Sequence, residues 1–438
     1  GEHLLHVLNT LGSRKDVLEA ELKEIDDDGN GYTDDICGWD FFGRDNDAFH
    51  TYTGHDYGKH GDGVARKMAS EGNDDDGKIG VCPNCMVLPV RISDTFITDG
   101  TRVAEGIVFA ADSGAVGMTL AIGALTNPDS AAAASRYAYD QGLTLVGAAG
   151  DENAYHRNFP AMMPDIVYVH SIRYDSMDEY GRISSYFNTW NCNNYGARMD
   201  VVAPADACAT GAVSNITGMV GLIYSAARDA GLELTAGEVR QIINQTADDV
   251  AKPEAERAIS NAYPSEVGWD PFYGYGRVNA ARAVERVVSG DIPPSVRVTG
   301  PDWFAPIDPA VVFSVPVDVE IDARRTGSFS WTVEVGRGNA PSDWTTVDSG
   351  AGGEGFSGTL TEVDLSEADW TAPVRPDLGE GILERMERVN VNQVTLRVRV
   401  TAADGGIARR VKGKIVVVAL LTGAHDEADV VVVAAIAL

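Results

Sequence analysis

The sequence predicts an α/β protein in which a doubly wound, mainly parallel sheet is followed by an antiparallel β-sandwich. Strand-like and helix-like segments alternate through the first 289 residues, an order that places helices on both faces of a parallel sheet. After a stretch that contains Gly and Pro, apolar residues recur with a period of two, as in antiparallel sheets. We therefore expect two domains, residues 1–289 and 298–438, joined by a linker at 290–297.

Composition places the chain among soluble globular proteins. It has 438 residues, of which 44% are apolar and 23% charged, enough for two or three domains. The longest apolar runs, Ile415–Leu421 and Val430–Leu438, are too short to span a bilayer and indicate buried strands, so no membrane span is expected. A net charge of -30 repels nucleic acid, so no nucleic-acid partner is expected either.

The first domain begins with a short strand at His6–Leu8 that ends in a polar turn at Asn9. Thr235 and Glu238 form a capping-box pattern that predicts a helix start, and a last helix at 280–288 closes the domain. Between these ends we expect helix 63–70, strand 87–92, helix 103–113, strand 115–122, helix 131–141, strands 143–149, 166–171 and 200–203, and a long apolar helix that Ser214 precedes and that runs through Ala230.

The second domain shows repeated short strands with β-branched residues and Gly- and Asp-containing turns. Residues 371–390 are expected to be an insertion of loop and short helix. The tail, 424–438, is expected to add a strand, one that could pair with a neighbouring molecule. The predicted strands are 311–321, 328–335, 394–400 and 412–421.

An acidic loop near the start carries oxygen-bearing side chains at alternate positions, with Gly at the bend. Hard cations need this spacing, because alternate residues of a tight loop turn their oxygens inward. The alternative is a solvated acidic turn, and Cys37 at the twelfth loop position, where an EF-hand has Glu, excludes an ordinary EF-hand. We predict a structural calcium ion held by Asp26, Asp28, Asn30, Tyr32, Asp34 and Asp35.

Five cysteines leave one unpaired if two disulfides form. Cys192 with Cys208 is the favoured bridge. Cys82 and Cys85 flank a Pro-Asn turn, which makes either a small disulfide loop or a redox pair; the acidic, calcium-motif context favours the first. The cysteines favour an extracellular, secreted protein.

His60 lies between glycines at the start of a helix-like run, where a near-neutral pKa suits proton transfer. Taken alone, such a histidine is more often a surface or structural residue. Its meaning depends on the motifs around it.

Those motifs, in chain order, resemble the subtilisin-like serine proteases, the subtilases. The match covers about the first 285 residues, and the resemblance implies the subtilase fold. Beyond residue 294 the chain resembles, more loosely, immunoglobulin-like modules appended to secreted bacterial subtilases, notably at Trp331–Glu334 and Leu396–Val400. The subtilase-like motifs are Asp26–Trp39, His60-Gly61 with Val64-Ala65, Gly80–Asn84, Leu88–Arg91, Ala148–Gly150, Phe159–Ala161, Val202–Pro204 and Gly274–Ala280.

The resemblance implies an Asp-His-Ser triad whose positions are held here by Asn9, His60 and Ser214. An Asn amide carries no charge to stabilise imidazolium, and the matching substitution in a serine protease lowers turnover by about ten-thousandfold. Asp151 stands where the family places the Asn that donates to the oxyanion, and an ionised carboxylate would repel that charge.

Further positions around the site also depart from the family. Instead of Gly-Thr-Ser-Met-Ala the chain has Ala212–Ile216, and Asp62-Gly63 and Ala121 replace residues of the His and substrate-strand motifs. We therefore expect a pseudoprotease. One alternative is that the alignment places the catalytic serine a few residues away from its true position. Another is that Asp62 or Asp151 replaces the missing acid of the triad in a changed mechanism.

Three classes of function remain. The first is a catalytically dead or strongly impaired subtilase that acts as an extracellular binding or structural protein, with a peptide or protein ligand, or as a homo-oligomer or filament. The second is a weak or specialised serine endopeptidase that uses His60 and Ser214. The third is a calcium-dependent adhesive module or assembly subunit, and a shared fold does not choose among them.

Overall fold

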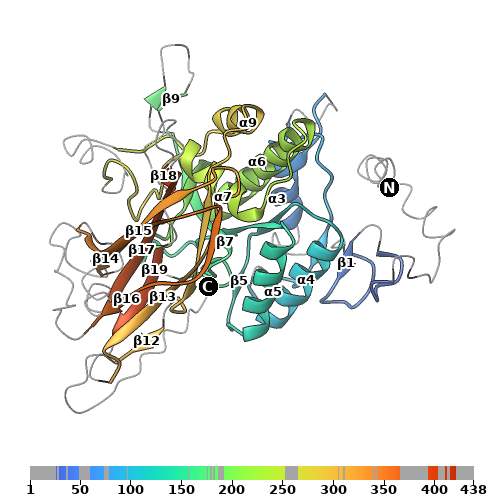
Figure 1. Ribbon diagram of the computed structural model, residues 1–438. Coiled ribbons are helices and arrows are strands. Elements are labelled where there is room, and N and C mark those ends of the chain that lie inside the picture. Colours follow the sequence, from blue (N-terminus) through green and yellow to red (C-terminus); the bar gives the residue numbers. More distant parts are fainter. Residues whose placement is uncertain are drawn as a thin grey trace.

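The computed structural model (Figure 1) describes residues 26, 29–35, 38–48, 60–73, 78–95, 97–155, 157–174, 176–177, 180, 183–185, 192–251, 265–303, 305–308, 311–338, 341, 343–365, 393–402, 410–411 and 415–420. The predicted strand at His6–Leu8, the insertion at 371–390 and the tail at 424–438 lie outside the described residues. Within the described chain, no helix combines the length and apolar character needed to cross a membrane.

A four-stranded parallel sheet forms the centre of the first half. Its order is β10-β7-β6-β4, and every neighbouring pair is parallel. β6 and β7 are buried along their whole lengths, as expected for strands covered by helices on both faces. The strands are β4 (Gly117–Leu120), β6 (Thr144–Ala148), β7 (Ile166–Ile172) and β10 (Val201–Pro204).

Helices cover both faces of this sheet. Figure 1 shows α6 with α3 and α9 on one face and α4 with α5 on the other. α6 is the central helix: it contacts β4, β6, β7 and β10, and twelve of its residues are buried. The helices are α3 (His60–Ala69), α4 (Gly100–Asp112), α5 (Asp129–Asp140), α6 (Ala209–Asp229), α7 (Ala236–Thr246) and α9 (Ala280–Val288).

Three pairs of short strands extend the first half. β1 (Trp39–Asp40) pairs in parallel with β2 (Val90–Arg91), and β3 (Ile97–Thr98) pairs in parallel with β5 (Gly123–Ala124). β8 (Ser176–Met177) and β9 (Ile183–Ser185) form an antiparallel pair. β5 begins at Gly123, the last residue of the Ala121–Gly123 motif, so the β3–β5 pairing joins that motif to the segment at Ile97–Thr98.

Two mainly antiparallel sheets form the second half. One has the order β11-β13-β16; the other has the order β12-β19-β17-β14-β15, with β18 paired to β17. The pair β12–β19 is the parallel exception. The strands are β11 (Ser295–Gly300), β12 (Pro306–Ile307), β13 (Ser314–Asp322), β14 (Phe329–Arg337), β15 (Thr345–Gly352), β16 (Gly355–Asp364), β17 (Gln393–Ala402), β18 (Arg410–Val411) and β19 (Ile415–Leu420).

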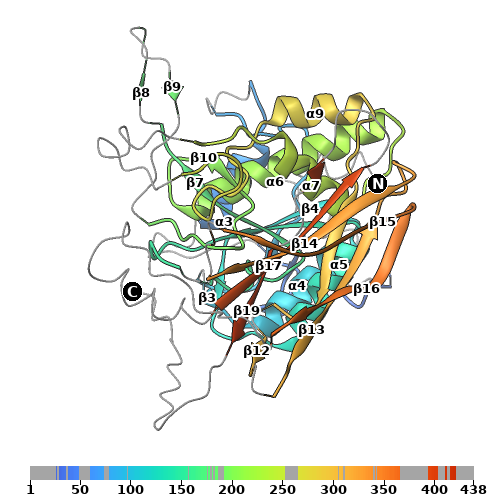
Figure 2. The same cartoon turned by 60° about the vertical axis from the view of Figure 1, so that its left-hand side comes forward.

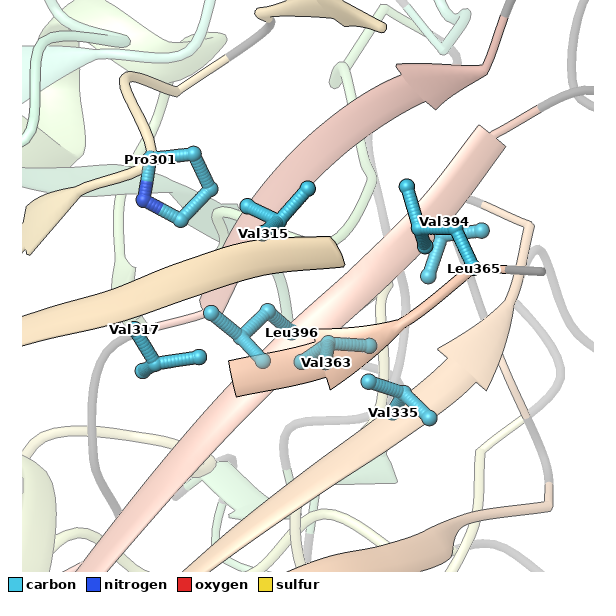
Figure 3. Close-up of a pocket in the computed structure, with 8 residues that line it drawn as sticks. All are labelled: Pro301, Val315, Val317, Val335, Val363, Leu365, Val394 and Leu396. Carbon is cyan, nitrogen blue, oxygen red and sulfur yellow. The ribbon is translucent and has the colours of Figure 1, made fainter. Parts of the chain in front are cut away.

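Apolar side chains from both sheets share one core. Alternate residues of β13, including Val317 and Val319, are buried, as the period-two pattern predicts. Figure 3 shows Val315 and Val317 from one sheet converging with Val394 and Leu396 from the other around a small apolar pocket.

Polar contacts fasten the second half to the first. Arg297 on β11 lies against Asp165, with its Nε 2.8 Å and Nη2 2.9 Å from the two carboxylate oxygens, and stacks 4.7 Å from the ring centre of Tyr139. Arg325 donates to Glu238 of α7 at 2.6 Å. Figure 2 shows the two sheets of the second half lying alongside the helical half.

Most predicted elements of the first half are present, and the Thr235–Glu238 capping box is confirmed. Helix 280–288 has the predicted bounds. One boundary is wrong in a way that matters for function: α6 begins at Ala209, so Ser214 lies inside the helix and does not precede it. β11 begins at Ser295, within the range predicted as a linker.

Candidate active site at the start of helix α6

His60 is the first residue of α3 and is half-buried. Burial, and to a smaller degree the positive charge of Lys67, lowers the pKa of His60 below its ordinary value. The imidazole is therefore neutral near pH 7 and can accept a proton. Asp62, proposed as a substitute acid, is exposed in the first turn of the same helix.

α3 packs against the first half of α6. A Cβ placed on Gly218 would come within 2.7 Å of the Val81 side chain and 3.0 Å of the Met68 carbonyl, so only glycine allows this approach. Nearer the start of α6, a Cβ on Gly211 would lie 3.5 Å from Nζ of Lys67, which is also in the last turn of α3 and pairs with Asp206. The start of α6 therefore faces the helix that carries His60.

Ser214 is fully buried, and its hydroxyl donates to the Thr210 carbonyl at 3.2 Å. It lies in the second turn of α6, between buried Val213 and buried Ile216. A nucleophile must reach a substrate carbonyl from an accessible position. The structure thus places Ser214 in the helix core, and the register predicted from the resemblance is wrong in this respect.

Thr210 was not predicted as a site residue from the sequence. It is the second residue of α6, is half-buried, and carries a hydroxyl. The pattern Gly-Thr-Ser-Met-Ala fits four residues earlier than predicted: Thr210 then occupies the Ser position and Ala212 the final Ala position. Two features of the sequence could have indicated Thr210. Gly218 follows it by eight residues, and the resemblance places the serine motif near the start of a helix.

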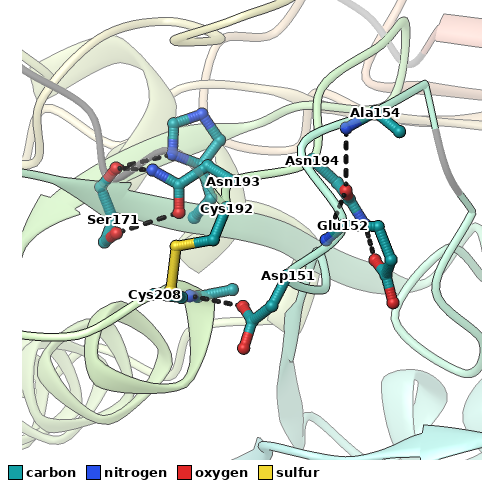
Figure 4. Close-up of a disulfide and its surroundings, with 10 residues drawn as sticks. Asp151, Glu152, Ala154, Ser171, Cys192, Asn193, Asn194 and Cys208 are labelled. Carbon is teal, nitrogen blue, oxygen red and sulfur yellow. Dashed lines mark hydrogen bonds between the residues drawn. A yellow bond between two sulfur atoms is a disulfide. The ribbon is translucent and has the colours of Figure 1, made fainter. Parts of the chain in front are cut away.

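Asp151 reaches the start of α6 and caps it. Its Oδ1 accepts the backbone N–H of Ala209, the first residue of the helix, at 3.0 Å (Figure 4). Although Asp151 is exposed, the surrounding protein partly desolvates its carboxyl and raises its pKa, while the Ala209 N–H opposes that rise. A carboxylate at a helix N-terminus is electrostatically favourable and occupies the place where an anion would otherwise bind.

The segment that leads into α6 is short and is held by a disulfide. Four residues, 205–208, separate the end of β10 from α6, and Cys208 is the N-cap residue. Cys208 is bridged to Cys192 (Figure 4). Next to Cys192, the buried Asn194 accepts the backbone N–H groups of Glu152 and Ala154 at 3.1 Å each. The segment at residues 192–194 therefore holds both the loop that carries Asp151 and the start of α6 in position.

The structure thus brings Asp151 to the start of α6 and places α3, which begins with His60, against the same helix. Asn9, the predicted acid position, lies outside the described residues. Both predicted disulfides are present, Cys82–Cys85 and Cys192–Cys208, whereas Cys37 lies outside the described residues.

Replacing Lys67 by Gln is expected to raise the pKa of His60, because the variant removes a positive charge that opposes protonation. Folded His60 binds a proton less readily than the unfolded chain, so its contribution to stability is lost as the pH falls below about 6.5. NMR titration of the His60 Cε1 proton in both proteins measures the shift. An unchanged or lower pKa in Lys67→Gln would contradict the assignment.

The predicted calcium loop is a tight turn. The Asp26 carboxylate accepts the N–H groups of Gly29, Asn30 and Gly31 at 2.8–3.0 Å, and both glycines have positive φ. The Asn30 amide donates to Asp35 at 2.7 Å.

The described residues of this loop do not form a complete metal site. In the described part of the chain, no group of three or more acidic, His or Cys side chains could hold a metal ion. Asp28 lies outside the described residues. Tyr32 points from the loop into an aromatic cluster, with ring centres 5.1 Å from Trp39 and 5.2 Å from Phe109, so it anchors the loop to α4.

Comparison with known proteins agrees with the fold and the motifs. The subtilase family matches residues 19–276. A thermophilic serine proteinase of Bacillus sp. (strain AK1) is 32% identical over 263 residues, which cover 57% of this chain and 56% of the relative. Thermitase of Thermoactinomyces vulgaris is 30% identical over 265 residues, covering 57% of this chain and 81% of thermitase.

A halolysin-like extracellular serine protease, Nep, of Natrialba magadii is 28% identical over 258 residues, covering 56% of this chain and 42% of the relative. The chain thus spans about half the length of the Bacillus and Natrialba relatives. With the motifs, the central parallel sheet and the family match over residues 19–276, this chain belongs to the subtilase family.

Proposed function

We propose that this subtilase hydrolyses peptides very poorly or not at all, and that it acts outside the cell as a binding protein for a peptide or protein ligand. The observation that carries the proposal is the Asp151 carboxylate on the first N–H of α6. Amide hydrolysis by a serine-protease mechanism creates a negative oxygen that must be met by hydrogen-bond donors. Here the negative Asp151 carboxylate already accepts the Ala209 N–H, at the start of the helix that is expected to carry the nucleophile.

The burial of Ser214 supports the same proposal, because the residue has no exposed surface from which to attack. The hydroxyl at the start of the helix belongs to Thr210, whose β-methyl group crowds the oxygen and restricts its rotation. The Asp151 carboxylate and the hindered hydroxyl of Thr210 would each lower the rate of peptide hydrolysis. The two losses need not add, because the residues of an active site act as one unit.

Casein hydrolysis by the purified protein tests the proposal, with His60→Ala as the matched control. We expect the two proteins to release peptides at the same background rate, while fluorescently labelled casein peptides bind to the unmodified protein and remain intact. Turnover by the unmodified protein that is lost in His60→Ala would contradict it.

A second candidate is a weak or specialised endopeptidase, favoured by the lowered pKa of His60 at the start of α3. A neutral imidazole is the form that takes a proton from a hydroxyl. In this alternative Thr210, not the buried Ser214, supplies the hydroxyl. It predicts slow casein turnover that rises as His60 loses its proton and that disappears in both His60→Ala and Thr210→Val.

We also propose that the two sheets of the second half form an immunoglobulin-like β-sandwich, and that the protein is secreted. Their shared apolar core supports the first proposal. Two disulfides and the description of one relative as extracellular support the second. A homo-oligomer or filament stays a prediction, which light scattering of the purified protein tests directly.

Calcium is proposed as a structural ion of the loop at residues 26–37, on the strength of its oxygen spacing and its glycines of positive φ. Adding calcium to about a hundred times its dissociation constant is expected to stabilise the fold by about 2.7 kcal/mol, because the ion binds only the folded loop. Calorimetry with calcium and with EDTA measures the change in melting temperature. An identical melting temperature in the two buffers, or an equal shift in Asp26→Ala, would contradict the proposal.

A further inference from the structure

The Cys82–Cys85 bridge closes a very short loop. The two cysteines are three residues apart, against sixteen for Cys192–Cys208. The N–H of Cys85 donates to the Cys82 carbonyl at 2.9 Å, which closes the turn over Pro83 and Asn84. A disulfide stabilises largely by restricting the unfolded chain, and the restriction grows with the size of the loop it closes. The shorter bridge is therefore the less strongly held of the two.

This bridge lies at a structural junction. Backbone N–H groups of the segment that leads to it cap the end of α3: Gly80, Val81 and Cys82 donate to the carbonyls of Ser70, Lys67 and Met68 at 2.9, 3.2 and 2.9 Å. The segment therefore satisfies carbonyls that a helix end otherwise leaves without partners. α3 begins, at its other end, with His60.

The sulfur atoms also rest directly on α6. A Cβ placed on Gly221 would lie 2.5 Å from Sγ of Cys85 and 3.1 Å from Sγ of Cys82, so only glycine fits beneath the bridge. Cys82 is buried, with 4% of its surface exposed, whereas Cys85 is half-buried. Cys85 is thus the more exposed of the two residues, and its sulfur is the one that we expect a small thiol to attack.

We propose that the Cys82–Cys85 bridge is a reversible thiol–disulfide switch that sets how α3 packs on α6. Two sulfur atoms joined by a bond of about 2 Å must move apart when the bond is broken. Gly221 of α6 leaves no room for even a Cβ beneath the two sulfurs, so we expect their separation to displace residues 80–86 from α6. That displacement removes the amide caps from the end of α3. The proposal is independent of whether the protein hydrolyses peptides.

The chemistry is ordinary thiol–disulfide exchange with a small dithiol as reductant. A thiolate of the dithiol attacks Sγ of Cys85; the new S–S bond forms as the Cys82–Cys85 bond breaks, and Cys82 leaves as a thiolate. The second thiolate of the dithiol then attacks the mixed disulfide and releases Cys85. The protein gains two electrons and two protons, and the dithiol becomes a cyclic disulfide.

Graded reduction of the folded protein with dithiothreitol, followed by iodoacetamide and peptide mass spectrometry, tests the first part. Peptide masses separate Cys37 from the other cysteines. We expect Cys82 and Cys85 to be alkylated together at dithiothreitol concentrations at least tenfold below those that expose Cys192 and Cys208. Equal sensitivity of the two bridges, or resistance of Cys82–Cys85 until the protein unfolds, would overturn the proposal.

Hydrogen exchange tests the second part. Exchange of the amides at 66–69 and 80–86 is expected to become at least tenfold faster on mild reduction and to return to its original rate on reoxidation, while β6 and β7 stay protected. The variant Cys82→Ser/Cys85→Ser should match the reduced protein in either buffer, and Cys192→Ser/Cys208→Ser should retain the redox response. Unchanged exchange on reduction, in a protein whose Cys82 and Cys85 are alkylated, would refute the coupling.

The variant Gly221→Ala gives an independent check, because its Cβ would push against Cys85. We expect this variant to be reduced at a lower dithiothreitol concentration than the unmodified protein. Gly63→Ala, at a helical position of α3 with nothing within 4 Å of the added Cβ, is the matched glycine control. An equal effect of the two variants, or no effect of Gly221→Ala, would count against the contact.

Discussion

Restoring three site residues, in the variant Asn9→Asp/Asp151→Asn/Thr210→Ser, is expected to raise casein hydrolysis at least about a thousandfold above the unmodified protein. Asp at position 9 would supply the charge that stabilises imidazolium. Asn at position 151 would replace a carboxylate that accepts the Ala209 N–H with an amide that can donate to an oxyanion. Ser at position 210 would place an unhindered hydroxyl at the start of α6.

Two further variants make this result specific. Adding His60→Ala to the repaired protein should return hydrolysis to the background, because no base would remain to take the hydroxyl proton. Restoring a serine by Thr210→Ser alone should give far less activity than the triple change, since the three residues act as a unit. If the repaired protein is folded and as inactive as the parent, the assignment of Thr210 and Asp151 to the site is wrong.

Replacing Arg240 by Met is expected to lower the free energy of unfolding by about 3–5 kcal/mol, because it leaves the buried Asp200 carboxylate without its ionic partner. Arg240 donates to both Asp200 oxygens, from Nη2 at 2.9 and 2.6 Å, and Nε adds a bond at 3.0 Å. Asp200 precedes β10 and also accepts the N–H of Tyr168 at 2.9 Å, so the pair joins α7 to the central sheet.

Urea denaturation followed by circular dichroism measures this loss. Arg324→Met provides the matched control, because Arg324 pairs with Asp322 at the surface, where ion pairs contribute about 0–1 kcal/mol. A change of less than about 1 kcal/mol in Arg240→Met, comparable to the control, would mean that the buried pair does not hold the sheet and α7 together.

The sequence predicted the fold well where the chain repeats a regular pattern. The buried strands at Thr144–Ala148 and Ile166–Ile172 are mainly apolar, and the helix at Ala280–Val288 lies between a capping Asn279 and Gly290. Two-residue strands such as β3 and β5 were not predicted, because a segment of that length has no periodicity. Their pairing depends on tertiary contacts.

The start of α6 was misplaced for a related reason. Residues 209–213 are Ala, Thr, Gly, Ala and Val, which carry little helical periodicity, so the apolar pattern begins only further along the helix. The serine nearest to that apolar pattern is Ser214, which is buried, whereas the half-buried hydroxyl at the helix start belongs to Thr210, four residues earlier. Gly218 must be glycine because Val81 and Met68 approach it closely, and this packing of α3 on α6 could not be read from the apolar pattern.

The role of Asp151 was predicted only in part. Its negative charge beside a developing oxyanion follows from the sequence motif, whereas its bond to Ala209 joins residues 58 positions apart and depends on the short connection after β10. The Cys192–Cys208 bridge, which was predicted, helps to fix that geometry.

Labelling of the intact protein with a fluorophosphonate, read by peptide mass spectrometry, tests most directly whether the start of α6 works as a nucleophile site. Such reagents modify hydroxyls that a neighbouring base has activated. We expect no modification of Ser214, because it is buried, and none of Thr210, because Asp151 occupies the donor beside it. Stoichiometric modification of either residue that is lost in His60→Ala would contradict it.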